Sequence, residues 1–520
     1  MITHYERGKA QFQEFMAGID VEDSTFYKPI KKNRMDFIIF SKQKVLQEEC
    51  QLFSKLFISC QSRECDLKEF FGYENHTFPA ALSDGGKIHS CQKSQRAGIL
   101  ESLVAIPDTE PEADIIIIDG SALIYSLPPR GSKSFEDYAV RDFLPTIEAY
   151  STKYKRTDIV FDVYLPMSLK VETRSRRGRG VRRRVTNKGN IPSNWQSFLR
   201  DNDNKTELFH YLADKIAQMS AQNVVIVTKE ENALSTQTMS LDELAPCTDT
   251  RIFVHAKQAT KEGRKNIIIK ANDTDILVIA VSILPTLQGI GLQQLGIAFG
   301  QGRNLKWIPV HDLCLSIGME KSKGILFFHA FTGCDVVSAF RGKGKKTAWQ
   351  TWEVCDEASD LFSKLSQYPP TVVYDDELKI LEQCVVTMYD RSSVAEGVND
   401  ARFDMFARKQ RAYKAIPPSQ AALLQHLKRA AYQAGIWSQS TVLQPEIQSP
   451  AEWGWTKEED HWQIFWTKLP PIWTKLPPIA ESCQQLTKLT SGCKSECRGR
   501  CKCYQFGLHC TALCSCRCQE

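Results

Sequence analysis

The chain has 520 residues, of which 42% are hydrophobic and 24% are charged, and its formal net charge is +5. This composition is that of a globular protein and excludes a largely disordered chain, and the length predicts two to four domains. The longest apolar runs, such as residues 276–284, are too short to span a bilayer, and residues 1–19 lack the apolar stretch of a secretory signal. We therefore expect an intracellular protein that has no membrane partner.

Strands and helices are predicted to alternate after a first region, residues 1–108, in which we recognise no chemistry. Short β-branched runs predict strands at residues 115–118, 159–163, 223–228, 251–255 and 266–271. Helical patterns lie between them, for example at residues 135–150 and 206–219. This alternation predicts an α/β fold with a parallel sheet, which we assign to residues 109–360.

Three further regions follow this domain. Residues 361–437 are expected to form a helical extension, in which Pro417-Pro418-Ser419 precedes a predicted helix at residues 421–434. Residues 438–482 are a Trp/Pro-rich linker that contains the heptad WTKLPPI twice, at residues 466–472 and 473–479. Residues 483–520 form a cysteine-rich module.

Aspartates stand at the carboxyl ends of most of the predicted strands, where ligands bind in parallel α/β sheets. Carboxylates that converge on one point repel each other unless a hard cation neutralises them. Two Mg²⁺ or Mn²⁺ ions about 3.5–4 Å apart, which activate water against a phosphodiester, are a common solution. The alternative is that each aspartate caps a helix or forms a turn. The candidates are Asp119, Asp162, Asp249, Asp273, Asp275 and Asp335.

The order of these motifs resembles that of the PIN-like (Rossmann-like) flap endonuclease family of XPG type. It runs Asp119-Gly120-Ser121, Phe161-Asp162, an acidic segment, Asp273-Thr274-Asp275 and Gly333-Cys334-Asp335. Residues 165–170 with the following arginines resemble the family's helical arch, and residues 335–348 resemble its helix-two-turn-helix. The resemblance implies a metal-dependent, structure-selective nuclease, in which the six aspartates bind two cations and Lys170 and Arg174 stabilise charge on the scissile phosphate.

One segment departs from the family pattern, which places two acids before the Asp-x-Asp strand. Here Asp249 takes the place of one acid and Cys247 takes the place of the other, with Glu243 as a candidate substitute. The second hypothesis is therefore a DNA-binding protein whose nuclease domain has lost its activity. A third is an interaction scaffold with a structural zinc module. The duplicated heptad and the pairing of domains also suit a gene of mobile-element origin.

Two basic segments suit a polyanion. Residues 170–188 hold nine basic residues against the single acid Glu172, and guanidinium groups bind phosphate in a bidentate manner. A nuclear-localisation stretch or a solvated loop are the alternatives for this segment. The glycine-flanked lysines of residues 342–347 suit contacts to a nucleic-acid backbone. The predicted nucleic-acid contacts are Arg176, Arg177, Arg179, Arg182, Arg183, Arg184, Lys343, Lys345 and Lys346.

Nine of the 18 cysteines lie between Cys483 and Cys518. Thiolates at short spacings bind zinc in a tetrahedron, and a segment with almost no apolar core must fold around metal. Reduced intracellular thiols argue against a disulfide knot. The module resembles the CXC domain of the tesmin family, although Ser491 stands where the family opens with a cysteine, and this resemblance implies a DNA tether and a nuclear location. The predicted zinc ligands are Cys493, Cys497, Cys501, Cys503, Cys510, Cys514, Cys516 and Cys518.

Overall fold

The computed structural model describes residues 71–74, 77–91, 94–164, 169, 180–244, 251–408, 411–458 and 461–467. The predicted zinc cysteines, Asp249, Cys247 and the basic residues from Lys170 to Arg179 lie outside the described residues.

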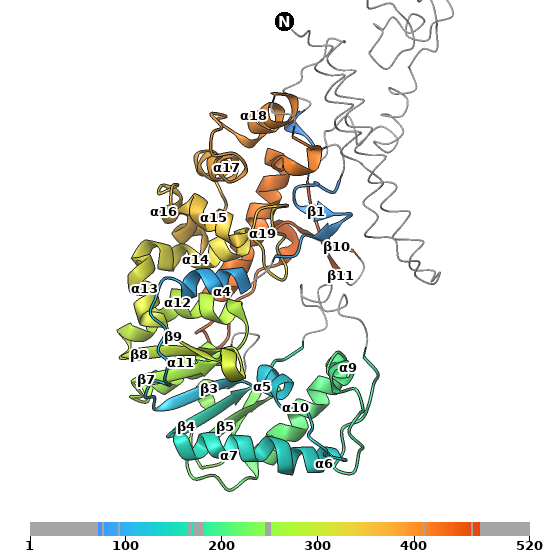
Figure 1. Ribbon diagram of the computed structural model, residues 1–520, viewed down its shortest axis with the longest axis vertical. Helices are drawn as coiled ribbons and strands as arrows, with labels where there is room; N and C mark the ends of the chain where they lie inside the picture. Colours follow the sequence, from blue (N-terminus) through green and yellow to red (C-terminus); the bar gives the residue numbers. More distant parts are fainter. Residues whose placement is uncertain are drawn as a thin grey trace, which may run out of the picture.

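A seven-stranded sheet forms the centre of the α/β part, in the order β6-β5-β4-β3-β7-β8-β9 (Figure 1). Five strands are parallel: β3 (Ile115–Asp119), β4 (Arg156–Val160), β5 (Val224–Lys229), β7 (Asn266–Lys270) and β8 (Gln294–Phe299). The edge strands β6 (Asn232–Ser235) and β9 (Lys306–Pro309) are antiparallel to their neighbours. The predicted α/β fold with a parallel sheet is confirmed.

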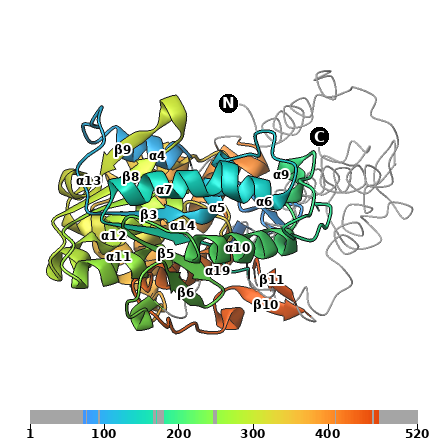
Figure 2. The same ribbon diagram turned by 90° about the horizontal axis from the view of Figure 1, so that it is seen from below.

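Helices cover both faces of the sheet. Successive side chains of the central strand β3 point to opposite faces, so its apolar residues need cover on each face. Ile116 and Ile118 enter the cluster formed with α5 (Gly120–Ser126), α6 (Phe135–Asp137), η2 (Tyr138–Phe143), α7 (Leu144–Lys153), α9 (Trp195–Phe198) and α10 (Asn202–Ala217). Ile115 and Ile117 face α11 (Arg251–Lys261), α12 (Thr274–Gly289) and α13 (Val310–Ile317). Figure 2 shows α7 and α10 side by side on the first face.

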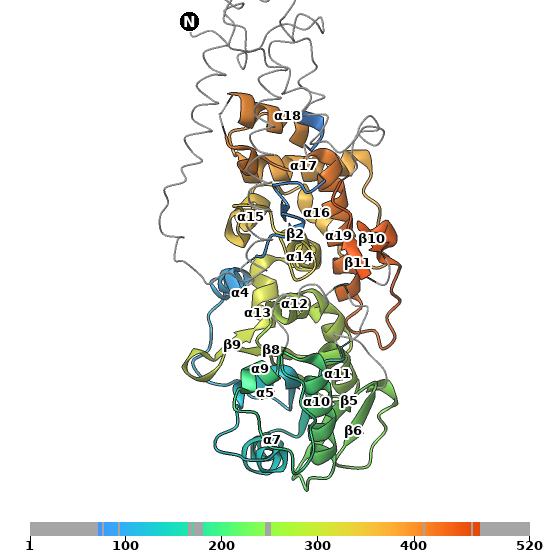
Figure 3. The same ribbon diagram turned by 90° about the vertical axis from the view of Figure 1, so that its right-hand side faces the viewer.

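A helical part continues from the second face (Figures 1 and 3). It contains α14 (Met319–Phe331), α15 (Lys345–Trp352), α16 (Ala358–Leu365), α17 (Asp375–Tyr389), α18 (Val398–Phe403) and α19 (Gln420–Ser438), with a hairpin of β10 (Trp455–Glu458) and β11 (His461–Ile464). The predicted helix after Pro418 is α19, and the Ser419 hydroxyl caps it by accepting from the Ala422 N–H. Across the described part of the chain, no helix combines the length and apolar character that crossing a membrane requires.

The described part of the N-terminal region packs against the loop that follows α14. This region forms β1 (Ser83–Asp84), β2 (Lys87–Ile88) and α4 (Ser94–Glu101). The backbone N–H groups of Ala339 and Arg341 donate to the carbonyls of His89 and Ala81, respectively. These two hydrogen bonds join segments more than 200 residues apart in sequence. They anchor the loop that carries Asp335 to the N-terminal region.

Some element predictions were wrong. Residues 251–255 begin helix α11 and are not a strand, because all five side chains are buried and a fully buried helix start has the same apolar pattern as a buried strand. Strand β4 begins at Arg156 and ends at Val160, so Asp162 lies in the segment after the strand. Strands β6, β8 and β9 had not been predicted; β6 and β9 are short edge strands, which carry little periodic signal, whereas β8 (Gln294–Phe299) is an inner strand that the sequence analysis missed.

Candidate metal centre and nucleic-acid interface

The chain order of the sheet places a topological switch point beside β3. From β3 the chain moves to β4 and β5 on one side, and later to β7 and β8 on the other side. Ligands bind outside the carboxyl ends of the strands at such a point. Asp119 is the last residue of β3, Asp162 follows β4 by two residues, and Asp273 follows β7 by three. The three strand ends thus deliver three of the predicted carboxylates to one edge.

A tight group of three carboxylates lies at this edge. Asp273, Asp275 and Asp335 each offer an oxygen, and these oxygens lie within 4.8 Å of one another. Asp273 also caps α12, because its Oδ1 accepts from the Asp275 N–H at 3.0 Å. The capping role and the site role therefore coincide in one residue. Asp275 is buried in the first turn of the same helix.

A glycine turn at the end of α14 presents Asp335 to the other two carboxylates. Gly333 has a φ of 107°, and a Cβ on it would lie 2.8 Å from the Cβ of Ala339. The Cys334 N–H then donates to the Val337 carbonyl at 2.9 Å. Only glycine fits this conformation and this close approach, which explains the Gly-Cys-Asp order in the sequence.

Asp119 is half-buried and adjoins the same group. Its Oδ1 accepts from the Ala122 N–H at 3.0 Å and caps α5, which by itself lowers its pKa. Desolvation, followed by the nearby charges of Asp162 and Asp273, outweighs this bond and raises the pKa of Asp119 to about 7. The next residue must be small, since a Cβ on Gly120 would lie 2.4 Å from the Phe161 ring. Burial and the charges of two neighbouring carboxylates thus act together on the pKa of Asp119.

The side chain of Asp162 is exposed, but two hydroxyl groups contact it and fix its orientation. The Ser121 hydroxyl donates to its Oδ2 at 2.9 Å, and the Tyr164 hydroxyl lies 3.5 Å from the same atom. The preceding backbone is tied to β5, because the Phe161 N–H donates to the Thr228 hydroxyl at 2.8 Å. The first and second aspartate motifs are thus linked through Ser121.

The donor chemistry of this edge fits a hard divalent cation. Every candidate ligand is a carboxylate, the type that Mg²⁺ and Mn²⁺ prefer. A cation would also relieve the repulsion that raises the pKa of Asp119. Glu243, the candidate substitute for the missing acid, lies in η3 (Asp242–Leu244), and its carboxylate pairs with Lys261 at 2.8 Å on the surface.

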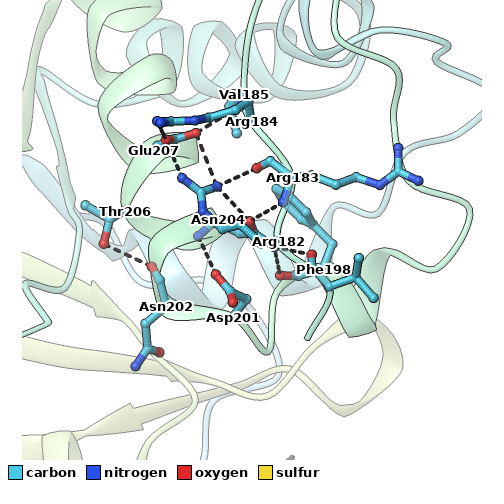
Figure 4. Close-up of polar contacts among 11 residues, drawn as sticks. Arg182, Arg183, Arg184, Val185, Phe198, Asp201, Asn202, Asn204, Thr206 and Glu207 are labelled. Carbon is cyan, nitrogen blue, oxygen red and sulfur yellow. Dashed lines mark hydrogen bonds and ion pairs between the residues drawn. The ribbon is translucent and has the colours of Figure 1, made fainter. Parts of the chain in front are cut away.

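The described arginines of the basic segment are anchored on α10 (Figure 4). Arg182 and Arg184 both pair with the Glu207 carboxylate, and Arg182 also donates to the Asn204 side chain at 2.9 Å. These arginines lower the pKa of Glu207 to about 2. The Arg183 N–H donates to Asn204 Oδ1 at 2.8 Å, while its side chain is exposed. Asn204 and Glu207 therefore fix the end of the segment, and Arg184 keeps 82% of its side-chain surface accessible.

The three lysines near α15 differ in accessibility. Lys345 is buried, and its ammonium donates to the carbonyls of His329 and Gly333 at 2.7 and 2.6 Å. This position does not fit the phosphate contact expected for it. Lys343 is half-buried, with its Nζ 4.9 Å from the centre of the Tyr389 ring. Lys346 is exposed and is the best placed of the three for a ligand outside the protein.

Sequence reasoning missed His329, which is buried in α14 with its Nε2 2.9 Å from Asp275 Oδ1. The signal in the sequence was weak: a single histidine within the apolar run of residues 325–331. Such a residue is more often part of a core than of a site.

No protein-family model matches the sequence, and no curated protein matches it. Solved structures that resemble it include three described as the catalytic core of Rad2 in complex with DNA substrate. Complex III is 13% identical and covers 67% of this chain and 94% of its own, with a TM-score of 0.32. Complex IV is 15% identical, with coverages of 61% and 83% and a TM-score of 0.28. Complex II is 13% identical, with coverages of 69% and 96% and a TM-score of 0.27. TM-scores of this size do not establish a shared fold.

Proposed function

We propose that this protein is a metal-dependent nuclease of the PIN-like flap endonuclease type. The observation that carries the proposal is the convergence of Asp273, Asp275 and Asp335 to within 4.8 Å at the switch point of the sheet. Asp119 and Asp162 join them from the ends of β3 and β4. The motif order along the sequence and the position of each motif in the sheet both support this function.

The chain's own groups have distinct tasks in this proposal. Asp273, Asp275 and Asp335 would hold a divalent cation, and Asp119 and Asp162, with Asp249 from outside the described residues, would complete the set for a second one. Cations bound there supply Lewis-acid stabilisation of the charge that develops on a phosphodiester during hydrolysis. Helix caps keep Asp119 and Asp273 in place before any ligand arrives, so the site is preorganised.

DNA is the proposed substrate, and its phosphates would contact the basic segment. Arg183, Arg184 and Lys346 have exposed side chains that suit this role. Lys170 and Arg174 would lie nearest to the scissile phosphate. The proposed zinc module of residues 483–520 would tether the protein to DNA in the nucleus.

The second candidate is a DNA-binding protein with a degenerate nuclease site. Cys247 favours it, because a thiol in place of a carboxylate removes one hard oxygen ligand. Such a protein would bind structured DNA and leave it uncut.

A cleavage assay separates the two candidates. Flap, single-stranded and duplex DNA are incubated with the full chain and Mg²⁺ or Mn²⁺. The matched variant is Asp273→Asn, which keeps the helix cap since asparagine caps as well as aspartate does. The control is Asp376→Asn, a carboxylate on α17 whose side chain is 98% exposed.

The nuclease proposal expects cleavage by the wild type and by Asp376→Asn, and none by Asp273→Asn, with DNA binding retained in all three. Binding without cleavage by the wild type would establish the second candidate. Cleavage that persists unchanged in Asp273→Asn would contradict the assignment of the site.

A further inference from the structure

A chain of buried polar groups runs from the carboxylate site into the helical part. Asp275 on α12 contacts His329 on α14, with 2.9 Å between Oδ1 and Nε2. The other ring nitrogen, Nδ1, lies 3.4 Å from the Nζ of Lys345 on α15. The three helices that carry these residues lie next to one another in Figures 1 and 3. His329 is fully buried, and Asp275 keeps 10% of its side-chain surface.

Lys345 determines which ring nitrogen of His329 carries the proton. An ammonium has donors and no acceptor, so a proton on Nδ1 would point at another donor. With its proton on Nε2, the ring instead presents Nδ1 to the ammonium as an acceptor. In that tautomer Nε2–H donates to the Asp275 carboxylate.

The surroundings hold both partners in place. The Lys345 ammonium also donates to the Thr332 hydroxyl at 2.9 Å and to the carbonyls of His329 and Gly333. These acceptors lie at the end of α14, where the last carbonyls of a helix can accept from groups other than the helix's own N–H donors. The Trp437 ring of α19 packs on His329, with 5.5 Å between ring centres. The imidazole therefore has little freedom to turn away from Asp275.

We propose that His329, fixed in its Nε2–H tautomer by Lys345, is a positioning residue that orients Asp275 for cation binding. This inference rests on the proposed function, because it assigns Asp275 a cation to bind. A hydrogen bond to one oxygen of the Asp275 carboxylate fixes the plane of this carboxylate. It thereby defines the direction in which the carboxylate faces the metal. Removing an outer-shell partner of this kind typically weakens metal affinity by about 10- to 100-fold.

The test measures Mn²⁺ affinity, without DNA and without catalysis, by isothermal titration calorimetry on the zinc-loaded full chain. Two neutral amides at position 329 form a matched pair. In His329→Gln the amide nitrogen reaches the position of Nε2 and can donate to Asp275. In His329→Asn the shorter side chain reaches only the position of Nδ1. Thr332→Val is the control, since it removes one acceptor of Lys345 and leaves the Asp275–His329 contact.

The inference expects His329→Gln and Thr332→Val to bind Mn²⁺ about as tightly as the wild type, and His329→Asn to bind it about 10- to 100-fold more weakly. Lys345→Met, which removes the partner of Nδ1, should weaken binding as well and provides a second route if the position-329 variants do not fold. Thermal unfolding without Mn²⁺ reports folding separately.

Equal Mn²⁺ affinities for folded His329→Asn, His329→Gln and wild type would overturn the inference and leave the proposed function intact. So would wild-type affinity in Lys345→Met, since the tautomer would then not depend on the ammonium. A wild type that binds no Mn²⁺ at this site would overturn the proposed function, and the inference with it.

Discussion

Replacing Asp119 by asparagine should stabilise the protein in buffer without Mg²⁺ or Mn²⁺ while removing a proposed metal ligand. The pKa of Asp119 is raised from an ordinary value of 3.8 to about 7, first by desolvation and then by Asp162 and Asp273. Between these two values the folded chain binds a proton that the unfolded chain has released. The free energy of unfolding therefore falls as the pH rises from about 4 to about 7.

The size of the change in the free energy of unfolding follows from the shift in the pKa of Asp119. Each pKa unit corresponds to about 1.4 kcal/mol, so the full shift destabilises the wild type by up to about 4 kcal/mol above pH 7. Asparagine has no charge to lose and keeps the cap, because its oxygen can still accept from the Ala122 N–H. The stability difference in favour of Asp119→Asn should grow by about 3 kcal/mol between about pH 5 and pH 8.

Denaturant unfolding of both proteins at several pH values measures this difference. Subtracting the two curves removes the contribution of the titrating groups that do not interact with Asp119. Adding Mn²⁺ at about pH 8 should then stabilise the wild type more than the variant, because a ligand stabilises only the state that binds it and the variant lacks one of the proposed ligands. A stability difference that does not change with pH would refute the argument that burial and the neighbouring carboxylates raise the pKa of Asp119.

Three further predictions concern other parts of the chain. Asp158→Asn should lower the free energy of unfolding by about 3–5 kcal/mol in denaturant titrations, because it removes the buried carboxylate that pairs with Arg156 and His255 and leaves Arg156 with the partly exposed Glu262 as its one carboxylate partner, yet Mn²⁺ affinity should not change. Lys346→Ala should weaken binding to all DNA sequences alike and reduce the salt slope of binding by about one, and an unchanged slope would show that Lys346 contacts no phosphate. A fragment of residues 480–520 should contain at least two zinc ions and unfold on chelation, and elemental analysis that finds less than one per chain would contradict this.

The sequence predicted the centre of the fold because the parallel strands are buried on both faces. The run Ile115–Ile118 is apolar without alternation, and such runs identify central strands well. The same signal led to a wrong prediction at residues 251–255, because the buried start of helix α11 has the same apolar pattern as a buried strand. The antiparallel edge strands β6 and β9 are four residues long and only partly buried, so they leave no comparable pattern.

The carboxylates could be predicted because each one stands at a fixed place relative to a strand or a glycine turn. Lys345 was misread because a lysine flanked by glycines is usually on the surface. Its burial depends on the carbonyls of His329 and Gly333 at the end of α14, and these become visible as its acceptors only when α14 and α15 are placed together. The partner of His329 is 54 residues away in sequence, on α12, and no local pattern indicates it.

The most direct test of the central claim is an anomalous difference map from crystals of the full chain grown with Mn²⁺. We expect a Mn²⁺ peak bound by Asp273, Asp275 and Asp335, with Asp119 facing the same cluster. Manganese peaks found only elsewhere, with these carboxylates directed away from any ion, would contradict it.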